Sequence, residues 1–235
     1  MNPVTLHGGH GKAIFLVFLI QNNVLQCAAM EILLNTFVVL FIVIDPVGLA
    51  PMFLALTPGT SPAFQRKMAV NGTLLASGML LVFYFVGDTL LAALRISLPA
   101  FRIAGGVLLF LLAIDMVFAR QSGLRSTTIR EQREAETKHD ISVFPLAFPL
   151  IAGPGALTTV LLMSSSAKGV FAFAGTLVVL LIVLGFTALS LLFAARILQF
   201  LGETGTNVIS RLFGLILAAL AVQYILDGVH ASFSA

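Results

Sequence analysis

Asp45 is the ionisable side chain whose position most suggests chemistry, because it stands directly before Pro46 in a long apolar run. No other charged residue lies between Glu31 and Arg66. A run of that length can cross the hydrocarbon core of a bilayer, so we expect Asp45 near the membrane centre. An ionisable group there costs roughly 2.5–3.5 kcal/mol on insertion scales and marks a functional site by default. Asp45 is therefore a candidate to carry a coupling proton or to bind a substrate ammonium group.

A structural role for Asp45 is the alternative. Aspartate is a preferred N-cap residue, and proline suits the first position of a helix, so Asp45 and Pro46 together also predict the start of a half-helix. A cap and a functional carboxylate are compatible with each other. The pattern alone does not separate them.

A second interrupted apolar segment, residues 149–160, contains no acid. Pro154 lacks the amide hydrogen that a helix interior needs, and Gly153 and Gly155 relax the backbone. Amide groups freed at the start of a half-helix can bind a carboxylate, and freed carbonyl groups can bind an ammonium. The two breaks together would suit a zwitterion. The expected substrate-binding residues are Asp45, Pro46, Gly48, Gly153, Pro154, Gly155 and Thr158.

Several other polar residues are weaker candidates. Asp115 is a second ion-coupling candidate, although an interfacial ion pair with Arg120 explains it equally well. Asn71 and Gln223 are expected as further buried polar side chains, and the Thr158 hydroxyl has the alternative of bonding a carbonyl of its own helix. Two more acids stand near span ends, where solvent exposure is the favoured explanation: Asp88 and Asp227.

The sequence offers no arrangement typical of an enzyme. It has no recognisable nucleophile–base pair, and Gly153-Pro154-Gly155 lacks the lysine and hydroxyl residues of a phosphate-binding loop. The single cysteine and the 4 histidines lack metal-ligand spacing. We therefore expect no catalytic residues, no metal and no cofactor.

The elements that must position these residues are membrane helices. The 235 residues are 59% hydrophobic and 10% charged, with a mean hydropathy of +1.06, which exceeds what a soluble core requires. The basic residues lie between the apolar segments, so topology explains them better than a nucleic-acid partner does. The composition predicts an all-α membrane protein with a lipid bilayer and a small-molecule substrate as its partners. The expected spans are roughly 32–56, 70–94, 101–119, 143–165, 170–195 and 209–228.

The two halves of the chain resemble each other. Pro46 and Pro154 are 108 positions apart (154 − 46), and the Arg-x-x-Gly motifs at 102–105 and 211–214 are 109 apart (211 − 102). We interpret the near-constant offset as an internal repeat, with a chance match as the alternative. Three spans per half put the second copy in the membrane upside down, as in many secondary transporters. The fold prediction is six transmembrane helices in two inverted three-helix repeats, with spans one and four discontinuous.

The distribution of basic residues predicts the orientation. Nine of the 13 lysines and arginines fall on one face, after spans one, three and five, and four fall on the other. The positive-inside rule puts the nine-residue face in the cytoplasm, so both ends of the mature chain are expected in the periplasm.

The first 29 residues fit this scheme poorly, because their apolar core at 13–20 is too short to span a bilayer. A misplaced start codon before Met30, a signal sequence and a retained tail are the alternatives. We expect a chain that starts at Met30 to insert normally. The predicted divisions are an extension (1–29), a first repeat (30–119), a cytoplasmic loop (120–141), a second repeat (142–229) and a tail (230–235).

The motifs resemble one known family. The runs at 44–57 and 144–158 and the Phe101-Arg-Ile-Ala-Gly-Gly106 start of span three are similar to those of the MarC family of bacterial and archaeal inner-membrane proteins. The resemblance covers about residues 30–229. It implies six spans with both ends periplasmic, and a relation to archaeal members that transport small neutral amino acids such as glycine and alanine, coupled to an ion gradient. It does not imply drug efflux.

The sequence thus favours a secondary transporter of a small zwitterion that works by alternating access. A membrane-embedded enzyme and a non-transporting helper subunit are the rival hypotheses. The direction of transport, the coupling ion and the oligomeric state do not follow from the sequence.

Overall fold

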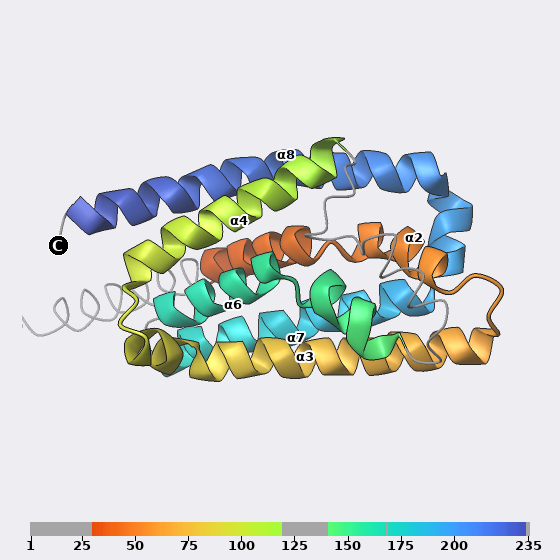
Figure 1. Cartoon of the computed structure of the whole chain (residues 1–235), viewed down its shortest axis with the longest axis horizontal. Helices are drawn as coiled ribbons and strands as arrows, with labels where there is room; N and C mark the ends of the chain where they lie inside the picture. Colours follow the sequence, from red (N-terminus) through yellow and green to blue (C-terminus); the bar gives the residue numbers. More distant parts are fainter. Residues whose placement is uncertain (1–29, 119–140, 168, 234–235) are drawn as a thin grey trace, which may run out of the picture.

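A computed structural model describes residues 30–118, 141–167 and 169–233, and within these ranges the chain is helical without strands. The predicted extension 1–29 and nearly all of the predicted loop 120–141 lie outside the described residues. The helices run in the order shown in Figure 1. They are a helix over residues 30–44, α2 (Pro46–Leu56), α3 (Pro62–Ala93), α4 (Leu98–Phe118), η1 (Ser142–Ile151), α6 (Pro154–Ser166), α7 (Val170–Leu192) and α8 (Ala194–Phe233).

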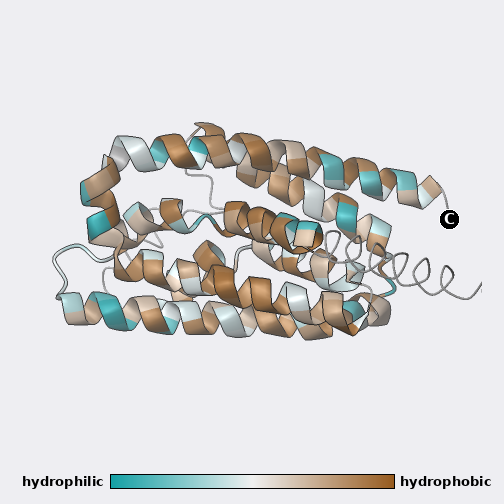
Figure 2. Cartoon of the chain, turned by 180° about the vertical axis from the view of Figure 1, so that it is seen from behind, coloured by the Kyte–Doolittle hydropathy of each residue, from teal (hydrophilic) through white to brown (hydrophobic). Residues whose placement is uncertain are grey.

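Among the described residues, five segments are long and apolar enough to cross a membrane, and a bent pair of helices is a sixth if the pair forms one span. The pair consists of η1 and α6, which meet at an angle of 59°. Hydrophilic residues gather toward the ends of the helices, with hydrophobic stretches between them (Figure 2). Large apolar side chains face outward from the bundle, among them Phe85 (57% exposed) and Leu215 (64%), as expected where lipid is the solvent. The predicted all-α membrane class is confirmed.

The first span lies at the centre of the bundle. Its most apolar stretch is 61% buried, against 22% to 39% in the other four long spans. Helix 30–44 and α2 lie between α4 and α8 on one side and α3 and α7 on the other, with η1 and α6 beside them (Figure 1). The first interrupted segment is therefore enclosed by the other helices of the bundle.

The start of the sixth span differs from the prediction. We expected a loop between spans ending at 195 and beginning at 209, but α8 is helical from Ala194 and bends at Gly202, where φ is +68°. Glycine adopts this left-handed conformation without a steric penalty, so a short helix and a long one join at one residue. Hydropathy did not reveal the short helix, because residues 194–201 are too few to form a span.

Helices α4 and α8 approach closely along glycines. A Cβ atom on Gly106 would lie 2.8 Å from the carbonyl oxygen of Ala221, and one on Gly228 would lie 2.9 Å from that of Pro99. Small residues allow such backbone contact between membrane helices. Gly78 and Gly185 make no such approach within the described residues, since no atom lies within 4 Å of a Cβ built at either.

Candidate functional site

Asp45 interrupts the first span in a left-handed conformation, with φ 49° and ψ 67°. The ring of a following proline disfavours the right-handed helical region for the preceding residue, and aspartate tolerates the left-handed one better than most residues. The backbone N–H of Asp45 still donates to the carbonyl of Phe41 at 2.9 Å, and its carbonyl accepts from Leu49 N–H at 3.1 Å. The break therefore occupies a single residue between two regular helices.

The Asp45 carboxylate is buried, at 1% exposure, and is held from two sides. Its Oδ1 accepts a hydrogen bond from the backbone N–H of Gly48 at 3.0 Å, which is the N-cap interaction for α2. Its Oδ2 accepts from the Ser210 hydroxyl of α8, also at 3.0 Å. The structural cap that the sequence offered as an alternative is present, and it also fastens α2 to the sixth span.

Gly48 and Ser190 complete the first break. A Cβ atom on Gly48 would overlap the Asp45 carboxylate and the Ser210 hydroxyl, so this position requires glycine. The Ser190 hydroxyl of α7 donates to the carbonyl of Pro46. Polar groups at this break thus receive hydrogen bonds from the fifth and sixth spans, which a buried polar site in a membrane needs.

The second break lies between η1 and α6. Gly153 is the N-cap residue of α6 in an extended conformation (φ −69°, ψ 168°), and Pro154 fills the first helical position. No side chain caps this helix. A Cβ on Gly153 would lie 2.5 Å from the carbonyl oxygen of Pro149, so the 59° bend brings the backbone of η1 against the start of α6.

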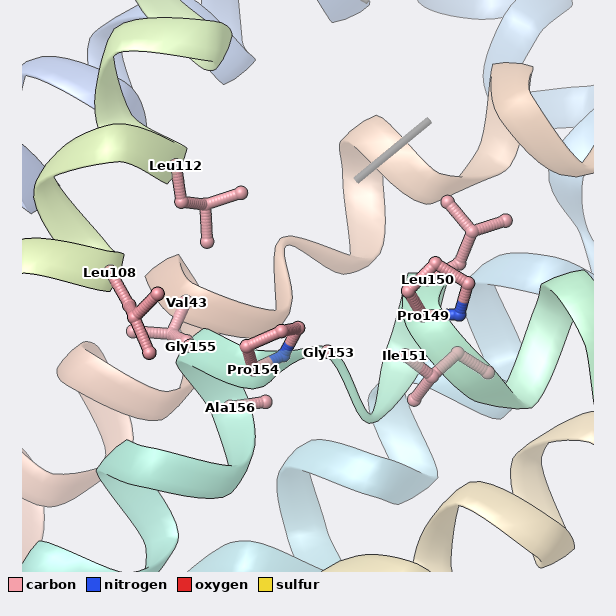
Figure 3. A pocket seen from close by; sticks show the side chains of 10 residues that line it. All are labelled: Val43, Leu108, Leu112, Pro149, Leu150, Ile151, Gly153, Pro154, Gly155 and Ala156. Carbon is pink, nitrogen blue, oxygen red and sulfur yellow. The ribbon is translucent and has the colours of Figure 1, made fainter. Parts of the chain in front are cut away.

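A cavity of about 20 Å³ lies at this second break. Figure 3 shows that Leu108 and Leu112 of α4 and Val43 of the first span line it together with residues of η1 and α6. The volume is enough for a water molecule but not for an amino acid. The remaining lining residues are Pro149, Leu150, Ile151, Gly153, Pro154, Gly155 and Ala156.

The cavity brings together only part of the predicted site. Gly153, Pro154 and Gly155 line it, and a Cβ on Gly155 would lie 3.9 Å from Val43 of the first span. Asp45, Pro46, Gly48 and Thr158 are not among its lining residues. The two breaks are neighbours, but the Asp45 carboxylate bonds toward α8 and the cavity lies toward η1 and α4.

The threonines of α6 behave differently from each other. The Thr158 hydroxyl donates to the Pro154 carbonyl at 2.8 Å, which is the alternative reading from the sequence, and a Cβ on Gly105 of α4 would overlap the Thr158 methyl group. Thr159 is fully buried, and within the described part of the chain its hydroxyl is the one buried side-chain polar atom without a hydrogen-bond partner. Such an atom calls for an explanation, such as a water molecule or ion.

The weaker candidates are not among the residues that line the cavity at the second break. Asp115 is buried on α4 at 9% exposure, but its suggested partner Arg120 lies outside the described residues. Asn71 is half-buried on α3. Gln223 was expected to be buried and is exposed on α8, where it donates to Asp227 Oδ1 at 2.7 Å, because residues four apart on a helix share a face.

The acids near span ends have different surroundings. Asp88 is exposed, as expected, and accepts a hydrogen bond from the Ser165 hydroxyl. Asp227 is half-buried, which corrects the expectation of simple solvent exposure. No group of three or more His, Cys, Asp or Glu within the described residues is placed to hold a metal ion.

Sequence reasoning missed Ser190 and Ser210, the hydroxyl partners of the first break. They stand 144 and 165 positions from the groups that they bind. The one available signal was that each hydroxyl stands in or next to an apolar span, and such side chains often bond between membrane helices.

Comparison with known proteins identifies relatives along most of the chain. The model of the MarC family integral membrane proteins matches residues 30–233. The chain is 36% identical over 201 residues to the UPF0056 membrane protein YvbG of Bacillus subtilis, covering 86% of this chain and 95% of that protein. It is 37% identical over 202 residues to the UPF0056 inner membrane protein YhgN of Escherichia coli K12, covering 86% and 98%.

An archaeal protein is also related. A UPF0056 membrane protein of Archaeoglobus fulgidus is 33% identical over 195 residues, covering 83% of this chain and 90% of that protein. No solved structure matches the chain. The helical bundle, its apolar outer surface and these matches agree, and the chain belongs to the MarC family of integral membrane proteins.

Proposed function

We propose that the protein is a secondary transporter of small neutral amino acids such as glycine and alanine in the cell inner membrane, coupled to an ion gradient. The observation that carries the proposal is the cavity at the Gly153–Pro154 break, which lies against the first interrupted span inside the bundle. Irregular backbone at membrane depth is tolerated only inside protein or beside a water-filled cavity. Two such segments in corresponding halves of a chain are typical of a transporter binding site.

The groups around the cavity suit both charges of a zwitterion. The first amide groups of a helix have no acceptor within the helix, so the N–H groups of Gly155 and Ala156 are available to a carboxylate. The last carbonyl groups of η1, at Pro149 to Ile151, are similarly available to an ammonium. A site with this little side-chain chemistry would admit only small substrates.

The cavity of about 20 Å³ must enlarge to admit an amino acid. Alternating access supplies such a change, because one repeat moves against the other around the site. Leu108 and Leu112 of α4 line the cavity with long side chains, so a movement of α4 relative to α6 would open it.

The helix contacts support two inverted repeats. Exchanging the halves pairs α3 with α7 and α4 with α8, and both pairs are in contact. It also relates the contact of α4 with α6 to the contact of α8 with α2, and the contact of α3 with α6 to that of α7 with α2. A pseudo-two-fold axis between the interrupted spans predicts this pattern of contacts.

The direct test is uptake of radiolabelled glycine or alanine into proteoliposomes, with an imposed proton gradient, an imposed sodium gradient or neither. We expect accumulation that exceeds that of protein-free vesicles and that depends on one of the gradients. Vesicles that stay at the protein-free level under every condition would contradict transport and would favour the enzyme or helper alternatives.

The orientation has its own test. A C-terminal reporter that is active only in the cytoplasm should be silent, because nine of 13 basic residues predict a periplasmic C-terminus. A strong cytoplasmic signal would reverse the proposed orientation without bearing on the substrate.

A further inference from the structure

A second, larger hollow of about 440 Å³ opens at the end of the bundle where the first span begins and the sixth ends. Its volume lies in the range of small-molecule sites. Helix 30–44, α4, α6, α7 and α8 all contribute to its lining. The lining residues are Ile32, Asn35, Thr36, Arg102, Leu162, Met163, Ser166, Ala167, Ala172, Thr176, Tyr224 and Asp227.

The hollow is distinct from the cavity at the second break. Along α6 the lining of the cavity ends at Ala156 and that of the hollow begins at Leu162, so the two sites are separated by about 9 Å of helix at a rise of 1.5 Å per residue. Thr36, which is buried in the hollow, precedes Asp45 by nine residues. The interrupted spans therefore lead from this hollow toward the breaks.

Two opposite charges face this hollow without forming an ion pair. Arg102 of α4 and Asp227 of α8 both line it. Within the described residues, neither forms an ion pair with the other or with a third residue. Arg102 Nη2 donates a long hydrogen bond of 3.4 Å to the Ser166 hydroxyl. Asp227 Oδ1 accepts from Gln223, which leaves its second oxygen for another donor.

From this geometry we propose that the hollow is an outer recognition site for a free amino acid zwitterion. Arg102 binds the α-carboxylate, since a guanidinium group presents a planar fork of donors that matches a carboxylate. Asp227 binds the α-ammonium group, with Tyr224 one helical turn away beside it. This inference rests on the proposed function, because it assigns the transported substrate a second binding site outside the breaks.

The hollow at the opposite end of the bundle lacks this pairing of charges. It has a volume of about 550 Å³, and the charged residues in its lining are Arg66 and Arg196, with no acid. Two cations suit an anion and repel an ammonium group. The two ends thus differ in charge, and only the end with Arg102 and Asp227 matches both groups of a zwitterion.

The test is equilibrium binding of radiolabelled glycine to the full-length protein in nanodiscs. We expect Arg102→Gln and Asp227→Asn each to raise Kd roughly tenfold or more, the loss expected for a hydrogen bond to a charged group. Matched controls are Arg95→Gln and Asp88→Asn, which remove charges outside the lining, and both should leave Kd unchanged.

Single-charge competitors separate recognition from a loss of fold. Propionate should compete with glycine in Asp227→Asn but not in Arg102→Gln, and ethylamine should show the reverse pattern. All variants are first checked for a monodisperse elution profile. If both variants bind glycine and both competitors as the unmodified protein does, the assignment of Arg102 and Asp227 to a recognition site is wrong. The proposal of transport at the breaks is not affected by that result.

Two further outcomes have defined meanings. If the unmodified protein neither binds nor transports glycine or alanine, the proposed function fails together with this inference. A phosphatidylethanolamine headgroup is also a zwitterion, so nanodiscs are prepared with and without that lipid. If the lipid raises thermal stability only when Arg102 and Asp227 are intact, and glycine has no effect, a lipid headgroup occupies the hollow and the amino acid assignment is overturned.

Discussion

The two helix breaks differ in how their buried polar groups are satisfied. At the first break, side chains from other spans satisfy the backbone and the buried carboxylate: Ser190 reaches Pro46, and Ser210 reaches Asp45. At the second break no side chain caps α6, and the structure leaves a cavity of about 20 Å³ there. The charge and the space therefore belong to different breaks. Hydrogen bonds and close contacts hold the first break in place, whereas the second break has the space in which a ligand would bind.

The largest expected effect is that of Gly48→Ala at the first break. The new Cβ would overlap the Asp45 carboxylate and the Ser210 hydroxyl, so the cap and the contact with α8 cannot both persist. We expect a loss of about 3 kcal/mol from overpacking and the lost cap, measured by thermal unfolding in detergent. The control is Gly78→Ala, where no atom lies within 4 Å. Equal stability of the two variants would mean that the close contacts of Gly48 with Asp45 and Ser210 do not hold the first break in place.

The next effect concerns the space at the second break. Gly155→Leu should abolish glycine uptake while most of the protein stays folded, because the added side chain fills the cavity and meets the flexible ends of Leu109 and Leu112 at about 3 Å. We expect a stability loss of about 1–3 kcal/mol. Gly185→Leu on the exposed face of α7 is the control. Uptake at the unmodified rate by Gly155→Leu would show that this cavity is not on the substrate path.

A smaller effect separates the charge of Asp45 from its cap. Asp45→Asn can still accept from Gly48 N–H and can donate to the Ser210 hydroxyl, so we expect it to lose less than about 1 kcal/mol. Because the charge is gone, gradient-driven accumulation should be lost while exchange of glycine without a gradient persists. Unchanged accumulation would mean that Asp45 caps α2 but has no role in ion coupling. Asp45→Ala, which removes both of these bonds, should lose about 2 kcal/mol.

The smallest effect is expected from Thr159→Val. Because the buried Thr159 hydroxyl has no hydrogen-bond partner within the described residues, replacing it with a methyl group should leave the melting temperature unchanged or raise it slightly. Thr187→Val is the matched control, since that equally buried hydroxyl donates to Val183 at 2.9 Å. A loss above about 1 kcal/mol for Thr159→Val would reveal a bound water or ion, and the second break would then be as well satisfied as the first.

Hydropathy predicted the apolar helices from the sequence, and the proline positions predicted where α2 and α6 begin. The segments 143–165 and 170–195 agree with η1 to α6 and α7 within a few residues, because twenty apolar residues have no other stable place than a bilayer or a core. Pro46 and Pro154 begin half-helices because proline has no N–H to donate and suits that position.

Side-chain surroundings could not be predicted in the same way. Whether Asp45 meets a hydroxyl of α8 depends on how spans far apart in the chain pack, and no local pattern encodes that contact. The wrong expectation for Gln223 has the same origin, since a polar residue in an apolar span can face the interior or the outside. The short helix before Gly202 was missed because eight residues carry too weak a signal.

The glycine contacts between α4 and α8 have a mechanical consequence. Backbone lies against backbone at Gly106 and Gly228, so no layer of bendable side chains separates these helices. The pair should therefore resist shear and move as one rigid unit. Leu108 and Leu112 stand on that unit and reach toward the second break, whereas α6 carries the opposite side of the cavity. Any change in the width of the cavity then has to come from a displacement of the whole α4–α8 pair or of α6, and the stiffness of the pair would set how far the two sides can separate.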